Sequence, residues 1–113
     1  MREARSGYGS DRWSSTVRAM YRVSVFYPKT EGASFDHDYY RTKHVPLAAK
    51  AWSPSSFEID RGVDGPYEAA VHFMFANQAA FHAALGSPLT GDVMADVPNY
   101  TTIVPVMQQS EIV

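Results

Sequence analysis

The fold of this chain is decided by residues 67–75, which read Tyr67-Glu68-Ala69-Ala70-Val71-His72-Phe73-Met74-Phe75. Successive side chains of a β-strand point to opposite faces of a sheet. One face therefore carries Tyr67, Ala69, Val71, Phe73 and Phe75, and the other carries Ala70, His72 and Met74 with Glu68. Because the second face is too apolar for bulk water, the stretch predicts a strand that is covered on both sides, with helices on the first.

Two more strands are expected upstream of this one. The loop Gly62-Val63-Asp64-Gly65-Pro66 has hairpin length, and Phe57 to Arg61 before it alternates apolar with charged side chains. These two strands are therefore expected to pair antiparallel. Nearer the start, Tyr21 to Tyr27 is rich in β-branched and aromatic residues and ends at Pro28, which predicts the first strand.

A first helix is expected between the first two strands. Asp36 is placed to be its N-cap, and Phe35 and Tyr40 then occupy the two positions that pack together in a hydrophobic staple. The helix should run to about Ala51. Pro46 inside it lacks a backbone N–H and crowds the preceding turn, which predicts a kink in the helix just before the proline.

The end of the chain is expected to supply a second helix and a last strand. Asn77 can cap a helix that Gly86-Ser87-Pro88 ends, and residues 92–97 read as a short extension of it. Residues Thr101 to Val106 predict a buried last strand, in which Pro105 indicates an edge position or a bulge.

The resulting order is β-α-β-β-α-β, which is typical of a ferredoxin-like α+β sandwich, a four-stranded antiparallel sheet with two helices on one face. In the first strand Ser24 and Phe26 share the face opposite Val23 and Val25, so that face is partly apolar here too. A chain of 113 residues is too short to add a third layer. We therefore expect a second copy to cover this face, pairing two sheets into a homodimeric α+β barrel with a cavity beside the strands.

Composition limits the domain organisation and the possible partners. The chain is 45% hydrophobic and 19% charged, as expected for a single globular domain, which we place at residues 20–113. Residues 1–19 carry four Arg against Glu3 and Asp11, a net charge of +2, and lack periodicity, so we expect a disordered or poorly ordered N-terminal extension.

Several classes of protein are excluded. A formal net charge of −2 provides no basic field for nucleic acid, and the lack of cysteine excludes disulfides and thiolate metal sites. No apolar run approaches the roughly 18–20 residues of a membrane span, and no secretory signal is evident. We therefore expect a cytoplasmic protein that binds neither nucleic acid nor membrane.

Functional side chains are densest in residues 35–47, where Asp36, Tyr40 and His44 follow at intervals of four on one stripe of the helix. A histidine beside a tyrosine at a kink can bind or protonate an oxygen of a small ligand. His44 and Tyr40 are therefore the catalytic candidates, and Asp36 and Tyr39 are ligand-binding candidates. Capping, the staple, and a core histidine bonded to a carbonyl explain the same residues structurally, and both readings stay open.

Three further ligand-binding candidates lie on strands. Phe26, His72 and Met74 belong to the face that a second copy would cover, so they would line the cavity of the dimer. His82 lies among Ala and Phe of the second helix, where a structural role is expected. The four histidines follow no known metal-binding spacing and no nucleotide-binding motif is present, so we expect no metal and no evident cofactor, although haem is not excluded.

The chain resembles the EthD family in two motifs. The first is Val23-Ser24-Val25-Phe26-Tyr27-Pro28, and the second is Phe35-Asp36-His37-Asp38-Tyr39-Tyr40 followed by His44-Val45-Pro46-Leu47. The resemblance covers nearly all of residues 20–113 and implies a dimeric α+β barrel. Every position of the second motif that the family shares is present: Phe35, Asp36, Tyr39, Tyr40, His44, Pro46 and Leu47.

The resemblance also implies a function. It points to the degradation of ethyl tert-butyl ether or related xenobiotics, with an oxidoreductase label, although the chain has no recognisable redox-cofactor motif. One hypothesis is therefore an enzyme, or an accessory to one, that acts on a small apolar metabolite with His44 as acid or base and Tyr40 or His72 orienting it. The alternatives are a non-catalytic dimeric protein that binds such a metabolite, or an enzyme like the related polyketide cyclases.

Overall fold

The computed structural model describes residues 20–113, and the extension expected over residues 1–19 lies outside them. Its four strands form one antiparallel sheet in the order β2-β3-β1-β4. Their bounds are β1 Tyr21–Pro28, β2 Ser56–Arg61, β3 Tyr67–Phe75 and β4 Val106–Glu111. The expected fold class, an α+β ferredoxin-like sandwich, is confirmed.

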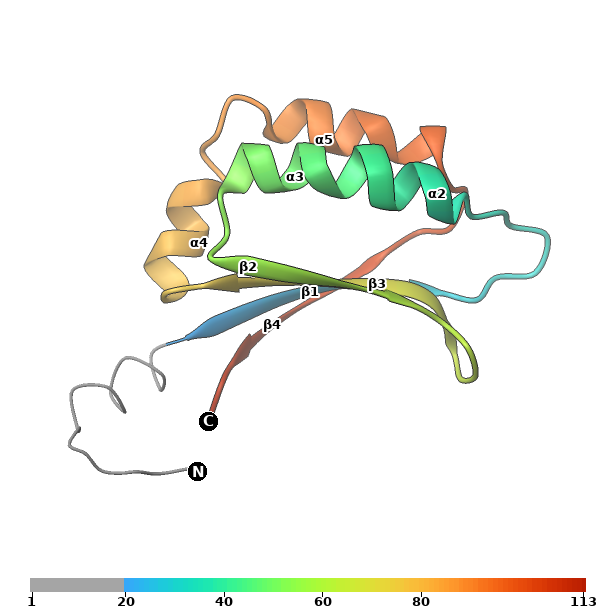
Figure 1. Cartoon of the computed structure of the whole chain (residues 1–113), viewed down its shortest axis with the longest axis horizontal. Coiled ribbons are helices and arrows are strands. Elements are labelled where there is room, and N and C mark those ends of the chain that lie inside the picture. Colours follow the sequence, from blue (N-terminus) through green and yellow to red (C-terminus); the bar gives the residue numbers. More distant parts are fainter. Residues whose placement is uncertain (1–19) are drawn as a thin grey trace.

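The helices of the described chain all lie on one face of this sheet (Figure 1). Between β1 and β2 the helix has three parts, which are α2 (His37–Tyr39), a π-helical segment η1 (Tyr40–His44) and α3 (Val45–Trp52). After β3 follow α4 (Gln78–Ala84), α5 (Thr90–Asp96) and the 3₁₀ turn η2 (Val97–Asn99). Figure 1 shows α3 and α5 side by side above the sheet, with α4 at one end. None of these helices within residues 20–113 has the length and apolar character to cross a membrane.

The predicted helix starts are confirmed in their atomic detail. The Asp36 carboxylate accepts a hydrogen bond from the backbone N–H of Tyr39 at 3.0 Å, and the rings of Phe35 and Tyr40 pack with their centroids 5.0 Å apart. The Asn77 side chain accepts in the same way from the N–H of Ala80 at 2.8 Å. Each cap satisfies a donor that the first helical turn would otherwise leave without a partner.

The core lies between the helices and the face of the sheet that carries Val23, Val25, Val71 and Phe73. Val23 lies opposite Phe73 and Val25 opposite Val71 in the pairing of β1 with β3. The most deeply buried large side chains are Tyr40, Phe73, Val23 and Val45. Burying an apolar side chain such as Val45 of α3 contributes roughly 1.5–3 kcal/mol, which holds α3 on this face.

The opposite face of the sheet carries the residues expected there. Ser24 pairs with His72, and Phe26 pairs with Ala70. No helix of the described chain covers this face (Figure 1). The prediction of a partly apolar second face is therefore confirmed, while its covering by a second copy stays a prediction.

One end of β3 departs from the predicted alternation. The register shifts between Tyr27 and Pro28, and Tyr67 then packs on Phe26, with ring centroids 4.9 Å apart. Glu68 instead reaches α2, where its carboxylate lies 2.7 Å from Nε2 of His37. The faces predicted for Tyr67 and Glu68 were therefore wrong, because a bulge exchanges the two faces from that point on.

Two expectations for the second half of the chain were also wrong. Residues 92–97 do not extend the helix that Gly86-Ser87-Pro88 ends, because α5 is a separate helix packed against α3. The last strand does not span Thr101 to Val106, since β4 begins at Val106. Pro105 has no N–H for the ladder, and Ile103 before it is buried in the core, so the strand forms only beyond the proline. The edge position that Pro105 indicated is confirmed for β4.

Candidate ligand cavity

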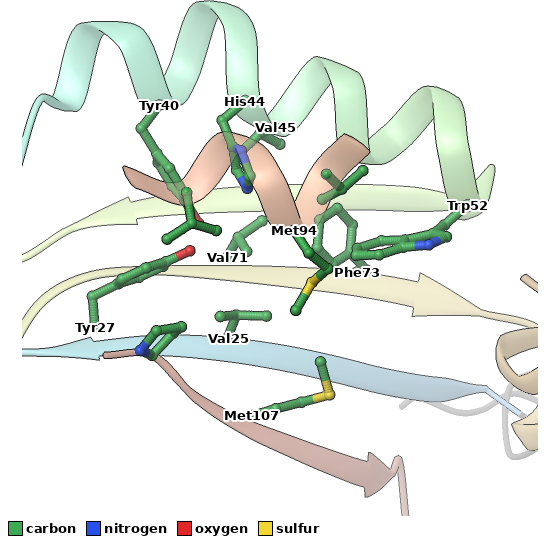
Figure 2. Close-up of a pocket in the computed structure, with 13 residues that line it drawn as sticks. Val25, Tyr27, Tyr40, His44, Val45, Trp52, Val71, Phe73, Met94 and Met107 are labelled. Atoms are coloured by element: carbon green, nitrogen blue, oxygen red, sulfur yellow. The ribbon is translucent and has the colours of Figure 1, made fainter. Parts of the chain in front are cut away.

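A cavity of about 200 Å³ lies between the sheet and the helices α3 and α5. For comparison, an engineered apolar cavity of about 150 Å³ holds benzene, so this one has room for a single-ring molecule. Most of its wall is apolar. The lining residues are Val25, Tyr27, Tyr40, His44, Val45, Trp52, Val71, Phe73, Val93, Met94, Val97, Pro105 and Met107 (Figure 2).

The π-helical segment places Tyr40 and His44 on this wall together. The N–H of Val45 bonds to the carbonyl of Tyr40, five residues back, so the helix makes one wide turn immediately before Pro46. The kink that was expected just before Pro46 is therefore a π-helical turn. The rings of Tyr40 and His44 stack with centroids 5.6 Å apart and an interplanar angle of 16°. Both side chains extend from the helix toward the sheet (Figure 2).

His44 is held by a carboxylate from the neighbouring helix. Its Nδ1 lies 2.9 Å from Oδ2 of Asp96, the last residue of α5. Asp96 also accepts hydrogen bonds from the Tyr39 hydroxyl at 2.7 Å and from the Asn99 side chain at 2.9 Å. Three donors from three different segments therefore converge on one carboxylate.

The charges of this pair follow from its surroundings. Burial lowers the pKa of His44 below its ordinary value of 6.5, although Asp96 acts in the opposite direction. Burial alone would raise the pKa of Asp96, but the hydrogen bonds from Asn99, Tyr39 and His44 outweigh it and bring that pKa below its ordinary value. Near neutral pH the pair is therefore a neutral imidazole beside a carboxylate.

This protonation state assigns roles to the two ring nitrogens. A carboxylate can only accept, so Nδ1 of His44 carries the hydrogen that bonds to Asp96. Nε2 is then a lone-pair acceptor, and within residues 20–113 it has no hydrogen-bond partner although His44 lines the cavity. A histidine oriented by a carboxylate, with its other nitrogen at an apolar cavity, has the geometry of a general base.

Three tyrosines cluster beside His44, of which Tyr27 and Tyr40 line the cavity and Tyr100 packs against Tyr40 and His44. The hydroxyls of Tyr27 and Tyr100 are 2.6 Å apart and share one hydrogen bond. The Tyr40 hydroxyl is buried and has no hydrogen-bond partner among the described residues. Burial raises the pKa of Tyr27, Tyr40 and Tyr100, with neighbouring tyrosines adding to it for Tyr40 and Tyr100, so all three hydroxyls keep their protons.

The structure separates the candidates that the sequence proposed. His44 and Tyr40 line the cavity, and Tyr39 acts one step behind it through Asp96. Asp36 is exposed and serves as the N-cap. Within the part of the chain that the structure describes, the hydrogen-bond partner of His44 is the Asp96 side chain and not a backbone carbonyl.

The other candidates lie across the sheet from this cavity. Phe26, His72 and Met74 belong to its open face. There Nδ1 of His72 lies 2.7 Å from the Ser24 hydroxyl and its Nε2 lies 2.9 Å from the Asp60 carboxylate. A ligand-binding role for these residues would need a site formed on that face, and it stays a prediction.

Sequence reasoning missed four residues of this region, namely Tyr27, Trp52, Asp96 and Tyr100. Tyr27 was visible as an inward position of β1, and the others carried no spacing signal. Trp52 closes the far end of the cavity and donates from its ring N–H to the Thr90 hydroxyl at 3.0 Å. Across residues 20–113, no group of three or more His, Asp or Glu side chains is arranged to hold a metal ion.

Comparison with known proteins identifies the family. No protein-family model matches the chain, and no curated protein matches it. A solved structure of an EthD-like protein from Ralstonia eutropha JMP134 is 33% identical, with a TM-score of 0.77 and coverage of 85% of this chain and 94% of that chain.

More distant structures share the fold. An ethyl tert-butyl ether (EthD) family protein from Bacillus halodurans C-125 is 14% identical, with a TM-score of 0.67 over 83% of this chain and 99% of that chain. A dimeric protein with a ferredoxin-like fold from Bacteroides fragilis NCTC 9343 is 10% identical, with a TM-score of 0.56 over 83% and 97%. Since the Ralstonia protein is 33% identical over nearly its whole length, this chain belongs to the EthD-like family.

Proposed function

We propose that this protein binds a small apolar metabolite in the cavity between the sheet and α3 and acts on it through His44 as a general acid or base. The proposal rests on the position of His44, whose Nδ1 is held by Asp96 while its Nε2 has no hydrogen-bond partner among residues 20–113 and His44 lines an apolar wall. Asp96 orients the ring and stabilises the imidazolium that forms when Nε2 takes a proton. Tyr40, stacked on His44, is the second group that contacts the ligand.

The biological setting that we propose is the breakdown of ethers or related xenobiotics. Membership of the EthD-like family supports it, and a cavity of about 200 Å³ accepts a branched ether or a single ring. An imidazole base moves protons and does not by itself oxidise an ether. The protein would therefore work beside an oxidoreductase, taking a proton from an intermediate or passing one to it.

Binding without catalysis is the second candidate. It is favoured by the adaptable apolar wall, which includes Met94 and Met107 (Figure 2), because methionine side chains fit ligands of varied shape. The two candidates differ in one property. Only the enzyme needs a basic Nε2 on His44, whereas a binding protein needs only the apolar wall.

The test uses 5-nitrobenzisoxazole, a small apolar compound that reports on a base. Removal of the proton on carbon 3 of its isoxazole ring breaks the ring N–O bond and gives a coloured cyano-nitrophenolate. We expect the protein to accelerate this reaction, and His44→Gln to lower the rate by about 100-fold or more, the usual contribution of a general base. His82→Gln on exposed α4 is the matched control and should leave the rate unchanged.

A second variant separates binding from catalysis. Val25→Phe would fill the cavity and should abolish calorimetric binding of ethyl tert-butyl ether, whereas Val63→Phe in the β2–β3 loop should not. Binding that survives His44→Gln, together with an unchanged rate of proton removal, would leave the non-catalytic candidate. Ether binding that is the same in Val25→Phe and in the wild type would exclude this cavity as the site.

A further inference from the structure

The cavity has one polar end and one apolar end. Figure 2 shows Tyr27, Tyr40 and His44 together at one side and Trp52 at the other, with Met94 and Met107 between them. A ligand in this space has only one orientation in which its polar atoms meet polar groups. The chemistry of that end therefore selects the ligand, on the basis of the binding function proposed above.

The Tyr40 hydroxyl is the group that this end leaves unsatisfied. Tyr40 is 1% exposed, and its hydroxyl has no hydrogen-bond partner among residues 20–113. The ring of Tyr27 lies close by, with centroids 5.3 Å apart, and its hydroxyl bonds to that of Tyr100 at 2.6 Å, which leaves the Tyr40 hydroxyl as the one of these three without a well-formed hydrogen bond in residues 20–113. An unpartnered buried hydroxyl costs stability, whereas a phenylalanine of the same shape would not. A ligand atom that accepts a hydrogen bond would remove that cost.

The neighbouring group, Nε2 of His44, needs a hydrogen-bond donor, whereas the Tyr40 hydroxyl needs an acceptor. Nε2 of His44 presents a lone pair, since Nδ1 carries the hydrogen that bonds to Asp96. The rings of Tyr40 and His44 stack nearly parallel, at 16° with centroids 5.6 Å apart, and both side chains extend from the helix toward the sheet (Figure 2). The site thus offers one donor next to one acceptor.

We propose that the ligand is a phenol, a hydroxylated single aromatic ring, whose oxygen accepts from the Tyr40 hydroxyl while its own O–H donates to Nε2 of His44. Its ring lies against Trp52 and the two methionines. An ether or a carbonyl oxygen would satisfy Tyr40 alone and leave His44 without a proton to accept. A hydroxyl group is the simplest group that satisfies both.

The same contacts define a reaction step. The phenol O–H bond breaks, its proton forms an N–H bond with Nε2 of His44, and the electron pair stays on the oxygen as a phenolate. The Tyr40 hydroxyl then donates to a negatively charged oxygen, which is a stronger hydrogen bond than the one to the neutral phenol. The Asp96 carboxylate balances the imidazolium. The step therefore prepares an electron-rich phenolate ring for a later reaction.

The probes are 4-nitrophenol, whose colour reports its ionisation, and 4-nitrotoluene, which has nearly the same shape but carries a methyl group in place of the hydroxyl. We expect the whole chain to bind 4-nitrophenol at least about tenfold more tightly than 4-nitrotoluene, the effect of one or two hydrogen bonds. The bound phenol should ionise at a lower pH than the free phenol. Tyr40→Phe should weaken both effects, because only the hydrogen bond to His44 then remains, while Tyr21→Phe, which removes a hydroxyl bonded to Gln109, should preserve them.

Each other outcome overturns the proposal in a recognisable way. Equal affinity for the two probes, unchanged by Tyr40→Phe, would refute the phenol site and leave apolar binding in the cavity intact. Failure of the wild type to bind either probe, or 5-nitrobenzisoxazole, would refute the proposed function as well. His44→Gln is the second variant, and retention of the lowered ionisation of 4-nitrophenol in it would exclude His44 as the base.

Discussion

The imidazole of His44 donates its Nδ1 hydrogen to the carboxylate of Asp96 over 2.9 Å, although 52 residues separate the two along the chain. His44 ends the π-helical segment that leads into α3, and Asp96 ends α5. The hydrogen bond therefore links the two helices that line the cavity opposite the sheet. Two further donors, Tyr39 and Asn99, hold the carboxylate in place. The orientation of the base is therefore built into the packing of α3 against α5.

Replacing Asp96 should weaken both the fold and the base. Asp96→Asn removes the charge and turns one accepting oxygen into a donor, so at least one of three hydrogen bonds is lost. We expect the free energy of unfolding to fall by about 2 kcal/mol, because hydrogen bonds to charged groups contribute about 1.5–3 kcal/mol. Urea unfolding measures this, and Asp64→Asn in the exposed β2–β3 loop is the control. A stability equal to that of the wild type would show that the hydrogen bonds of Asp96 do not stabilise the fold.

Two tyrosine variants should change the free energy of unfolding in different ways. Tyr27→Phe removes a hydroxyl that is bonded to Tyr100 and should lower the free energy of unfolding by about 1 kcal/mol. Tyr40→Phe removes a hydroxyl that has no hydrogen-bond partner within residues 20–113, and it should leave the ligand-free protein as stable as the wild type, or slightly more stable. Thermal unfolding of both variants without ligand checks the prediction. A clear loss of stability in Tyr40→Phe would mean that its hydroxyl has a structural partner.

Stability should depend on pH through His44. Its folded pKa is lowered by burial, so below about pH 6.5 the unfolded chain takes up a proton that the folded chain resists. Stability should therefore fall as the pH decreases from about 6.5 toward the folded pKa. The groups that face the ring are Asp96, Tyr40 and Tyr100, and the tyrosines stay neutral.

The measurement compares urea midpoints of the wild type and His44→Gln between about pH 7.5 and pH 5. His37 and His72 also lie beside carboxylates, and both remain in the variant, so the difference between the two proteins isolates His44. The wild type should lose more stability than the variant on acidification. Parallel curves would contradict the assigned cause of the shift.

The open face of the sheet predicts a dimer. We expect light scattering at micromolar concentration to give about twice the 12.6 kDa of one chain. Val106 lies on this face opposite Phe26 and is 53% exposed, so Val106→Glu should cost one chain little but place a charge inside the interface. The variant should sediment as a monomer. Val63→Glu, at a residue 95% exposed in a loop, should remain dimeric.

The strands that could be predicted are those whose side chains alternate strongly. Strands β1, β2 and β3 lie within one residue of the expected ranges, since each combines periodicity with a clear turn signal. The last strand could not be found in this way. Its residues from Met107 to Glu111 are mostly polar and exposed, and their pairing is fixed by β1 alone, whereas the apolar run before it is used to fill the core.

The candidate site was predictable only where its residues are close in the sequence. His44 and Tyr40 lie one helical turn apart, so the motif that contains them also identified one wall of the cavity. Asp96 reaches His44 from a helix that was expected to be only an extension of α4, and no local pattern records a bond between such distant residues. The face of β3 that the helices cover was predicted correctly at Val71 and Phe73, but three ligand-binding candidates were placed on the opposite face, because that face is apolar too.

Because Tyr40–His44 forms one wide turn, the number of residues in this segment matters more for the fold than the identity of the three between them. A regular α-helix rotates by about 100° per residue, so deleting one residue here would turn Val45, Ala48 and Ala51 away from the sheet or move Tyr40 off the cavity. The three residues in between, Arg41, Thr42 and Lys43, are exposed and contribute nothing to the core. Divergence within the family should therefore change these three side chains freely while keeping their number constant.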